Sequence, residues 1–251
     1  VTMKEAASWS ILWFGLSFIF AGLLWWYLDG IQGREQANTV TMQFITGYLV
    51  EKSLSIDNVF VFLMIFSYFA VPLEHQKRAL IIGIIGAIIL RAILILVGAW
   101  LLATFHWLLY VFGAFLVITG IKMWFAAGSE SDISKNPVLT FLRKHIKLTD
   151  KFDGEKLSTM INNTRHYTPL FVVLIMIAVT DIIFAVDSIP AIFAITQDPF
   201  IVLTANIFAI LGLRALYFLL ADLADRFHLL AYGLALVLVF IGTKMLIIDF
   251  Y

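Results

Sequence analysis

Long apolar stretches separated by polar connections make up most of the chain. An apolar run of about 20 residues is long enough to cross a bilayer as an α-helix. Seven such runs predict seven transmembrane helices, at Ser8–Leu28, Gln43–Ala70, Arg78–Ala103, Trp107–Ala127, Tyr167–Thr196, Phe200–Ala221 and Leu229–Phe250. The pattern therefore predicts an all-α polytopic membrane protein with a single transmembrane domain over residues 1–251.

One connection, residues 128–166, is much longer than the others and is rich in Lys, Asp, Ser and Asn. It is too long for a simple turn between two helices. We expect a solvated segment that carries a short amphipathic helix near Val138–Leu148. The alternative is a regulatory segment that binds a protein partner, for which the sequence shows no motif.

Lysine and arginine are unevenly divided between the two sides that seven spans create. If residue 1 is cytoplasmic, Arg34 alone falls on the far side. The cytoplasmic side then receives eleven of them: Lys4, Lys77, Arg78, Lys135, Arg143, Lys144, Lys147, Lys151, Lys156, Arg165 and Arg226. Because positive residues favour the cytoplasmic side, we predict that residue 1 and residues 128–166 are cytoplasmic.

Three features recur in the same order in the two halves of the chain: two acids six residues apart with a small polar residue after them, an arginine in an apolar run, and a Gly-x-Lys-Met motif. They occur at Glu51–Asn58, Arg91 and Gly120–Met123, and again at Asp181–Ser188, Arg214 and Gly242–Met245. Each repeat unit contains three helices. Because three is an odd number, the second copy must cross the membrane in the opposite direction to the first.

We therefore predict a 3+3 inverted-topology repeat, an arrangement that many secondary transporters have. Residues 43–127 form the first copy and residues 167–251 the second. Residues 8–28 form an extra helix outside the repeat. In such proteins the substrate site lies at the repeat interface near the bilayer midplane.

Four carboxylates lie inside the apolar runs at matched positions: Glu51 and Asp57 in the first copy, Asp181 and Asp187 in the second. A charged group in hydrocarbon is costly and marks a functional site by default. We expect the four acids to converge at the repeat interface and to hold a divalent cation that the protein moves.

Helix geometry separates the two acids of each pair. Residues seven apart lie nearly above one another, which pairs Glu51 with Asn58 and Asp181 with Ser188. Residues six apart differ by about 120°, so one regular helix cannot direct both of its acids to one ion. Pro190 removes an amide donor and clashes with the carbonyl four residues earlier. We expect the second stretch to unwind there, freeing a carbonyl as a ligand, and the first to be straighter.

The ligands available for such an ion are oxygen atoms. The chain has no cysteine, and its five histidines fall at helix ends or in connections. An all-oxygen set suits Mg²⁺, Ca²⁺ or Mn²⁺ and disfavours Zn²⁺, Cu⁺ and Ni²⁺. Residue types leave the choice among the first three open. We predict Asp57 and Asp187 as central metal ligands, Glu51 and Asp181 as ligands or proton carriers, and Asn58 and Ser188 as further ligands.

Two arginines, Arg91 and Arg214, lie within apolar runs. We expect them to compensate the charge of the acids, or to gate the site, when the ion has left. The structural alternative is that an acid forms a fixed ion pair with an arginine or with Lys52, Lys122 or Lys244, or that the arginines bond to helix carbonyls.

Proton coupling is the mechanism that buried acids favour. Burial disfavours a charged carboxylate, so an empty site would hold protons. Metal binding needs deprotonated ligands and would displace those protons. The sequence has no Walker A motif, nucleophile elbow or zinc-protease helix, and residues 128–166 are too few for a nucleotide domain. We therefore expect a cation/proton exchanger with no enzymatic activity and no cofactor.

Composition agrees with a membrane protein whose surroundings are the lipid bilayer. Of the 251 residues 62% are hydrophobic and 14% are charged, whereas soluble domains carry about 25% charged residues. The mean hydropathy is +0.97. The formal net charge is zero, so no nucleic-acid partner is indicated.

The stretches Glu51–Phe60 and Asp181–Ala191 resemble the two signatures of the TerC family. The likeness to its Alx branch continues through Leu203–Arg214 and covers nearly the whole chain. The resemblance implies a multi-pass protein of the bacterial inner membrane that is tied to manganese export, which makes Mn²⁺ the favoured transported ion.

Two departures from the family pattern qualify this. Related proteins usually have one more spanning helix before the first run and another after the seventh. They also often carry a glutamate just before the second signature, where this chain has Ile177–Thr180. The second departure predicts a site that is weaker or differently charged.

Three alternatives stay open from the sequence. The first is a Ca²⁺ or broader cation exchanger, which ion competition would separate. The second is a non-transporting membrane protein that senses Mn²⁺ or hands it to a partner through residues 128–166. The third is a membrane enzyme with paired acids, which the absence of substrate-activating groups disfavours.

Overall fold

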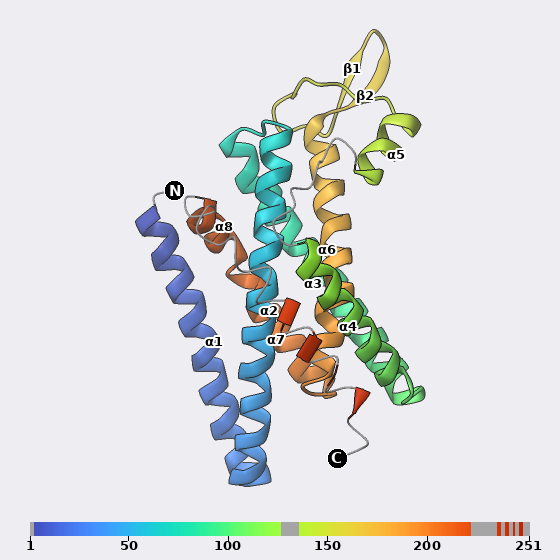
Figure 1. The fold of residues 1–251 in the computed structure, drawn as a ribbon. Helices are drawn as coiled ribbons and strands as arrows, with labels where there is room; N and C mark the ends of the chain where they lie inside the picture. The colour runs from blue at the N-terminus through green and yellow to red at the C-terminus, as the bar shows by residue number, and fades with distance from the viewer. Residues whose placement is uncertain are drawn as a thin grey trace.

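The computed structural model describes residues 3–126 and 136–221 and, beyond them, residues 235, 236, 239, 240, 243, 246 and 247. Within this part a bundle of helices carries a small polar extension at one end (Figure 1). The bundle helices are α1 (Met3–Gln32), α2 (Arg34–Tyr68), α3 (Leu73–Thr104), α4 (Leu108–Ala126), α6 (Pro169–Phe193), α7 (Pro199–Leu211) and α8 (Leu213–Ala221). The extension contains α5 (Pro137–His145), β1 (Ser158–Ile161) and β2 (Thr164–Tyr167).

Four of the described helices are long and apolar enough to cross a membrane: α1, α3, α4 and α6. The bent pair of α7 and α8 adds a fifth if it is one span. The longest helix, α2, has 35 residues. Because it carries more polar and charged side chains, it is less apolar than these helices and is not one of the four. Most of the seventh predicted span, Leu229–Phe250, lies outside the described residues, so the number seven stays a prediction.

The inverted repeat is tested only in part. Its first helices, α2 and α6, contact each other and run in opposite directions (Figure 1), as an inverted repeat requires. The last helix of the second copy falls on Leu229–Phe250 and lies mainly beyond the described part. The 3+3 repeat therefore also stays a prediction.

The sixth predicted run, Phe200–Ala221, is not one straight helix. It breaks at Gly212 into α7 and α8, which are bent by 42°. A Cβ atom at Gly212 would lie 2.8 Å from Lys52 Nζ and 3.0 Å from Trp13 Cβ, so a larger residue there would have to displace the side chains of Lys52 and Trp13. The Lys52 ammonium donates to the Ala209 carbonyl at 3.3 Å and so supplies a cation to the C-terminal turn of α7.

The expected unwinding at Pro190 is wrong, because α6 stays helical to Phe193. Pro190 still leaves the Val186 carbonyl without its usual amide donor, but the helix continues through it. Its own carbonyl accepts the N–H of Ala194. The first stretch was expected to be the straighter of the two. Helix α2 runs without a break from Arg34 to Tyr68, but α6 is also continuous, so their relative straightness stays a prediction.

Helix α2 lies at the centre of the bundle and contacts α1, α6, α7 and α8, while α3 contacts α6 and α7. Helices α1 and α2 form an antiparallel hairpin joined at Gly33, whose φ of 92° favours glycine. An aromatic cluster of Phe20, Phe44, Tyr48 and Phe208 ties this hairpin to α7. The packing places the middle of α2 between α3, α6 and α7.

The expected amphipathic helix near Val138–Leu148 is confirmed by α5. Asn136 caps it, since its Oδ1 accepts the N–H of Val138 at 2.9 Å, and Pro137 occupies the first turn, where proline is favoured. Leu139 and Leu142 are buried. The hairpin of β1 and β2 was not expected; its turn residues Asn162 and Asn163 have φ of 50° and 63°, as a two-residue hairpin turn requires.

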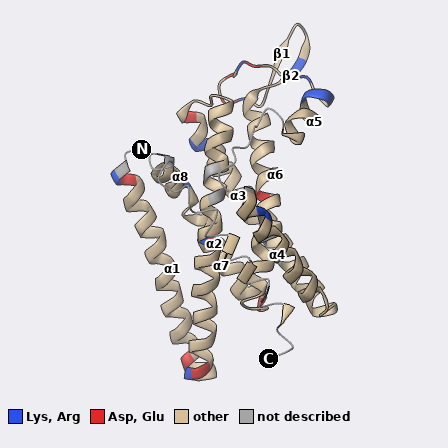
Figure 2. Cartoon of the chain, viewed as in Figure 1, with Lys and Arg blue, Asp and Glu red and all other residues tan. Residues whose placement is uncertain are grey.

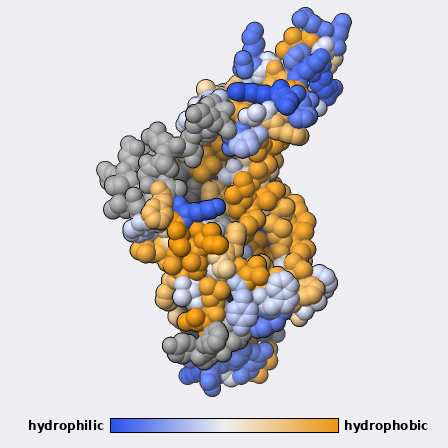
Figure 3. Space-filling view, turned by 45° about the vertical axis from the view of Figure 1, so that its right-hand side comes forward, coloured by the Kyte–Doolittle hydropathy of each residue, from blue (hydrophilic) through white to orange (hydrophobic). Residues whose placement is uncertain are grey.

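Charged residues gather at the two ends of the described structure (Figure 2). One group covers α5 and the hairpin, and another covers the turn between α1 and α2. Between them the surface is largely apolar (Figure 3). This distribution fits a protein whose helix bundle crosses a membrane. The few charged residues inside the bundle therefore require a structural or functional explanation.

Candidate functional site

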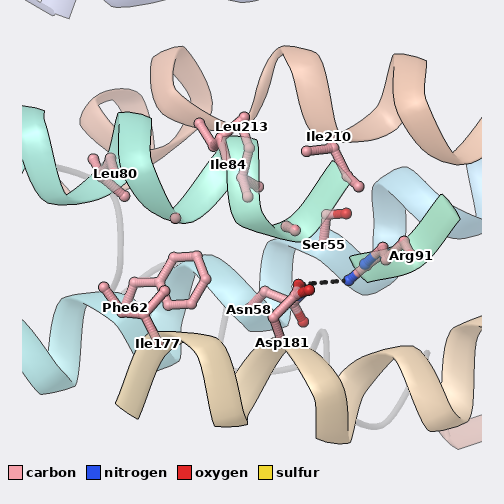
Figure 4. Close-up of a pocket in the computed structure, with 12 residues that line it drawn as sticks. Ser55, Asn58, Phe62, Leu80, Ile84, Arg91, Ile177, Asp181, Ile210 and Leu213 are labelled. Carbon is pink, nitrogen blue, oxygen red and sulfur yellow. Dashed lines mark hydrogen bonds and ion pairs between the residues drawn. The ribbon is translucent and has the colours of Figure 1, made fainter. Parts of the chain in front are cut away.

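Arg91, in the middle of α3, is the largest fully buried side chain, with 2% of its surface exposed. Its Nη1 donates to Glu51 Oε1 and, at 3.3 Å, to Asn206 Oδ1. Its Nη2 donates to Asp181 Oδ1 at 3.0 Å. Figure 4 shows the bond to Asp181 crossing the space between α3 and α6. One guanidinium therefore joins carboxylates from the two halves of the chain.

Helices α2 and α6 present their site residues at helical spacing. Glu51 and Asn58 are seven residues apart and are 0% and 2% exposed. Asp181 and Ser188 have the same spacing and are 5% and 1% exposed. The predicted pairing of positions on one helix face is thus confirmed, and the Ser188 hydroxyl lies close to the Glu51 carboxylate.

Two amides complete the surroundings of the guanidinium. In the orientation that satisfies both atoms of its amide, Asn58 places its oxygen 3.3 Å from Arg91 Nη2 and donates from its nitrogen to the Leu54 carbonyl at 3.3 Å. Asn206 of α7 is 1% exposed. The sequence offers its amide as an available oxygen ligand inside an otherwise apolar run, but Asn206 was not among the ligands predicted for the site.

The charges of the described site do not balance if both carboxylates are ionised, since two of them face a single guanidinium. Glu51 Oε2 and Asp181 Oδ2 are buried and have no hydrogen-bond partner in the described part of the chain. Buried polar atoms are usually paired. With Arg91 in place, the arrangement can therefore accept a proton on these oxygen atoms.

The site is tightly filled. The cavity bordered by Ser55, Asn58, Arg91 and Asp181 has a volume of about 10 Å³, which is about the space that one water molecule occupies. Figure 4 shows apolar side chains such as Phe62 and Leu80 continuing this lining along the bundle. A cation could bind between Glu51 and Asp181 only if the Arg91 guanidinium moved away.

The predicted central ligands cannot be placed. Asp57 and Asp187 lie on α2 and α6, directly before Asn58 and Ser188, but their side chains lie outside the described residues. Among the described side chains no group of three or more His, Asp or Glu could hold a metal ion. The roles of Asp57 and Asp187 as ligands stay predictions.

Arg214, the predicted counterpart of Arg91, lies in the first turn of α8 and is half-buried. The contacts of Glu51 and Asp181 in the described residues are to Arg91. Lys52, which could have paired with an acid, instead donates to the Ala209 carbonyl. Charge compensation thus comes from Arg91, and the predicted role of Arg214 stays untested.

Comparison with known proteins places the chain among bacterial membrane proteins. Residues 36–251 match the family described as "Integral membrane protein TerC family". A Salmonella typhi protein named "Putative membrane-bound redox modulator Alx" is 58% identical over 251 residues, which cover 100% of this chain and 78% of that protein. The Escherichia coli K12 protein of the same name is 56% identical with the same coverage.

A more distant relative is a Rickettsia felis protein named "Uncharacterized membrane protein". It is 42% identical over 247 residues, which cover 98% of this chain and 79% of that protein. No solved structure matches the chain.

Proposed function

The chain belongs to the TerC family of integral membrane proteins, and from this membership and its buried site we propose a secondary transporter that exports a divalent cation in exchange for protons. We propose Mn²⁺ as the transported ion. The observation that carries the proposal is the meeting of Glu51 and Asp181, from the two halves of the chain, at one buried arginine.

The ligand chemistry supports a hard divalent cation. The oxygen atoms near Arg91 come from two carboxylates, two amides and a hydroxyl, and such a set suits Mn²⁺, Mg²⁺ or Ca²⁺. We propose that Asp57 and Asp187 supply the central ligands. Glu51 and Asp181 then supply further oxygen atoms or carry protons.

The proposed cycle follows from charge balance. When Arg91 lies between Glu51 and Asp181, as in this structure, the guanidinium balances one of the two carboxylate charges and a proton can balance the other. An arriving divalent cation repels the guanidinium and takes its place among the oxygen atoms. When the cation leaves, protons or Arg91 restore neutrality, because bare carboxylates are costly in an apolar interior. Metal entry and proton release are therefore linked.

The name of the Salmonella and Escherichia relatives refers to redox modulation. The present sequence contains no cysteine, so thiol chemistry within these 251 residues cannot supply such a role. Cation transport uses the groups that the site does contain. A protein that only binds Mn²⁺, to sense it or hand it on, is the alternative that the experiment must separate.

The test is transport by the purified protein alone. Proteoliposomes carrying a Mn²⁺-sensitive dye and a pH indicator would be given Mn²⁺ outside. We expect Mn²⁺ entry with proton movement in the opposite direction, and competition by Ca²⁺ and Mg²⁺ would rank the ions. Tight Mn²⁺ binding without flux would instead identify a protein that senses Mn²⁺ or hands it to a partner. If Ca²⁺ were bound and transported in preference to Mn²⁺, Ca²⁺ would be the transported ion.

A further inference from the structure

A basic cleft lies at the end of the bundle where α2 ends and α6 begins. Its apolar floor includes Phe69, which follows α2, and Pro169 and Val172 from the first turn of α6. Its walls come from α5 and the residues that follow it. The volume of about 670 Å³ lies within the ~300–1,000 Å³ of typical small-molecule sites.

The cleft carries an excess of positive charge. Arg143, Lys144 and Lys147 line it, against the single carboxylate of Asp150. In the described residues none of these three cations forms an ion pair, and Arg143 donates to the neutral Tyr68 hydroxyl at 3.2 Å. Two other nearby acids are already engaged, since Glu155 pairs with Arg78 and Asp153 with Lys156. The cleft is therefore complementary to an anion.

Helix α5 has the character of a helix that lies in a membrane interface. Leu139 and Leu142 are buried against the bundle, while Phe141 is 58% exposed. The last turn is basic, with Arg143, Lys144 and His145. Basic residues beside an exposed aromatic are typical of helices that rest at the headgroup level of a bilayer.

The cleft also lies at the expected depth for a headgroup. The charged residues of α5 and β2 lie at one end of the described structure (Figure 2). On the face shown in Figure 3 the apolar surface of the bundle begins directly below that end. A ligand here would meet cations on one side and apolar surface on the other. Anionic phospholipids combine these two properties, and clusters of Lys and Arg beside a span recognise them.

We propose that this cleft binds an anionic phospholipid, with Arg143, Lys144 and Lys147 around its phosphate and the apolar floor beside its glycerol and upper acyl carbons. The site is separate from the one built on Arg91. It would anchor the α5 segment to the bilayer surface and fix the ends of α2 and α6 that border it.

The experiment compares two triple variants of the full chain in detergent. Arg143→Gln, Lys144→Gln and Lys147→Gln together remove the cleft cations. Lys151→Gln, Lys156→Gln and Arg165→Gln remove the same charge from the same segment outside the cleft lining. Binding of phosphatidylglycerol and of zwitterionic phosphatidylcholine is measured by native mass spectrometry and by titration.

We expect the parent and the second variant to prefer phosphatidylglycerol, and the cleft variant to bind it at least about tenfold more weakly. Equal weakening in both variants would reduce the effect to diffuse charge and overturn the site. Equal binding of the two lipids by the parent would overturn it as well.

Two further arms separate the remaining possibilities. Inorganic phosphate that displaced phosphatidylglycerol at a similar concentration would show a free-anion site and overturn the lipid assignment. The second arm uses a photoreactive phosphatidylglycerol with the parent protein alone, so its result does not depend on whether any variant folds. We expect its crosslinks in residues 137–149 and 169–172, and crosslinks confined to other segments would contradict the proposal.

Discussion

Arg91 is the residue on which the buried site depends. Its guanidinium bonds to Glu51, Asp181 and Asn206, and it lies close enough to Asn58 for a fourth bond. The sequence placed Arg91 in an apolar run but left open whether it would meet an acid, a carbonyl or neither. The partners are 40 and 90 residues away in the chain, so tertiary packing decides the pairing.

The first prediction concerns stability. Replacing Arg91 with methionine keeps a long side chain but leaves Glu51 and Asp181 buried without their cation. Removing one partner of a buried ion pair costs about 3–5 kcal/mol. We expect Arg91→Met to lower the free energy of unfolding by that amount, measured by thermal or denaturant unfolding in detergent.

The control for this prediction removes the stranded charges. Adding Glu51→Gln and Asp181→Asn to Arg91→Met should recover a large part of the lost stability, because neutral amides need no counter-ion. A loss under about 1 kcal/mol in Arg91→Met would contradict the idea that the guanidinium neutralises these acids, since exposed ion pairs are worth no more than that.

At the scale of elements, sequence reasoning succeeds where the cause is local. The amphipathic pattern near Val138–Leu148 predicts α5, and the seven-residue spacing predicts the shared faces of α2 and α6. It fails where the cause lies on another helix. The sixth run was expected as one helix but bends at Gly212, where Lys52 and Trp13 approach from α2 and α1, and no local pattern signals these contacts.

The second prediction tests the break between α7 and α8. In Gly212→Ala the added methyl would meet Lys52 Nζ and Trp13 Cβ at 2.8 and 3.0 Å. Overpacking of this kind costs about 1–3 kcal/mol. We expect a matching loss of stability and weaker transport, because α7 also carries Asn206.

Gly86→Ala on α3 is the matched control, since no atom lies within 4 Å of its added Cβ. Alanine is favoured over glycine inside a helix by about 1 kcal/mol. The control should therefore be neutral or stabilising. If the two variants behave alike, the close approach at Gly212 does not constrain the bundle.

At the scale of the whole molecule, the two polar ends of the described chain set its orientation. The turn between α1 and α2 lies at the end opposite to α5 and the hairpin (Figure 1). The distribution of Lys and Arg predicts that the α5 end is cytoplasmic. Family membership establishes a membrane protein, but it does not establish which end faces the cytoplasm.

The third prediction therefore concerns sidedness. The sequence has no cysteine, so single substitutions report on single positions. Lys151→Cys and Gln36→Cys place one thiol at each polar end. An impermeant maleimide added to intact cells should label Gln36→Cys alone, and Lys151→Cys should react only after the cells are opened. The reverse pattern would invert the proposed orientation.

The central claim is that carboxylates from both halves of the chain serve one cation path. The most direct test is Mn²⁺ flux into proteoliposomes, with internal pH followed in parallel, for the parent and for Asp57→Asn, Asp187→Asn, Glu51→Gln and Asp181→Asn. Each variant is first shown to be folded. We predict coupled Mn²⁺ and proton movement in the parent and a loss of at least about tenfold, or ~1.4 kcal/mol, in Asp57→Asn and Asp187→Asn. Unchanged flux in all four variants would contradict the account and would indicate that these acids form structural ion pairs instead.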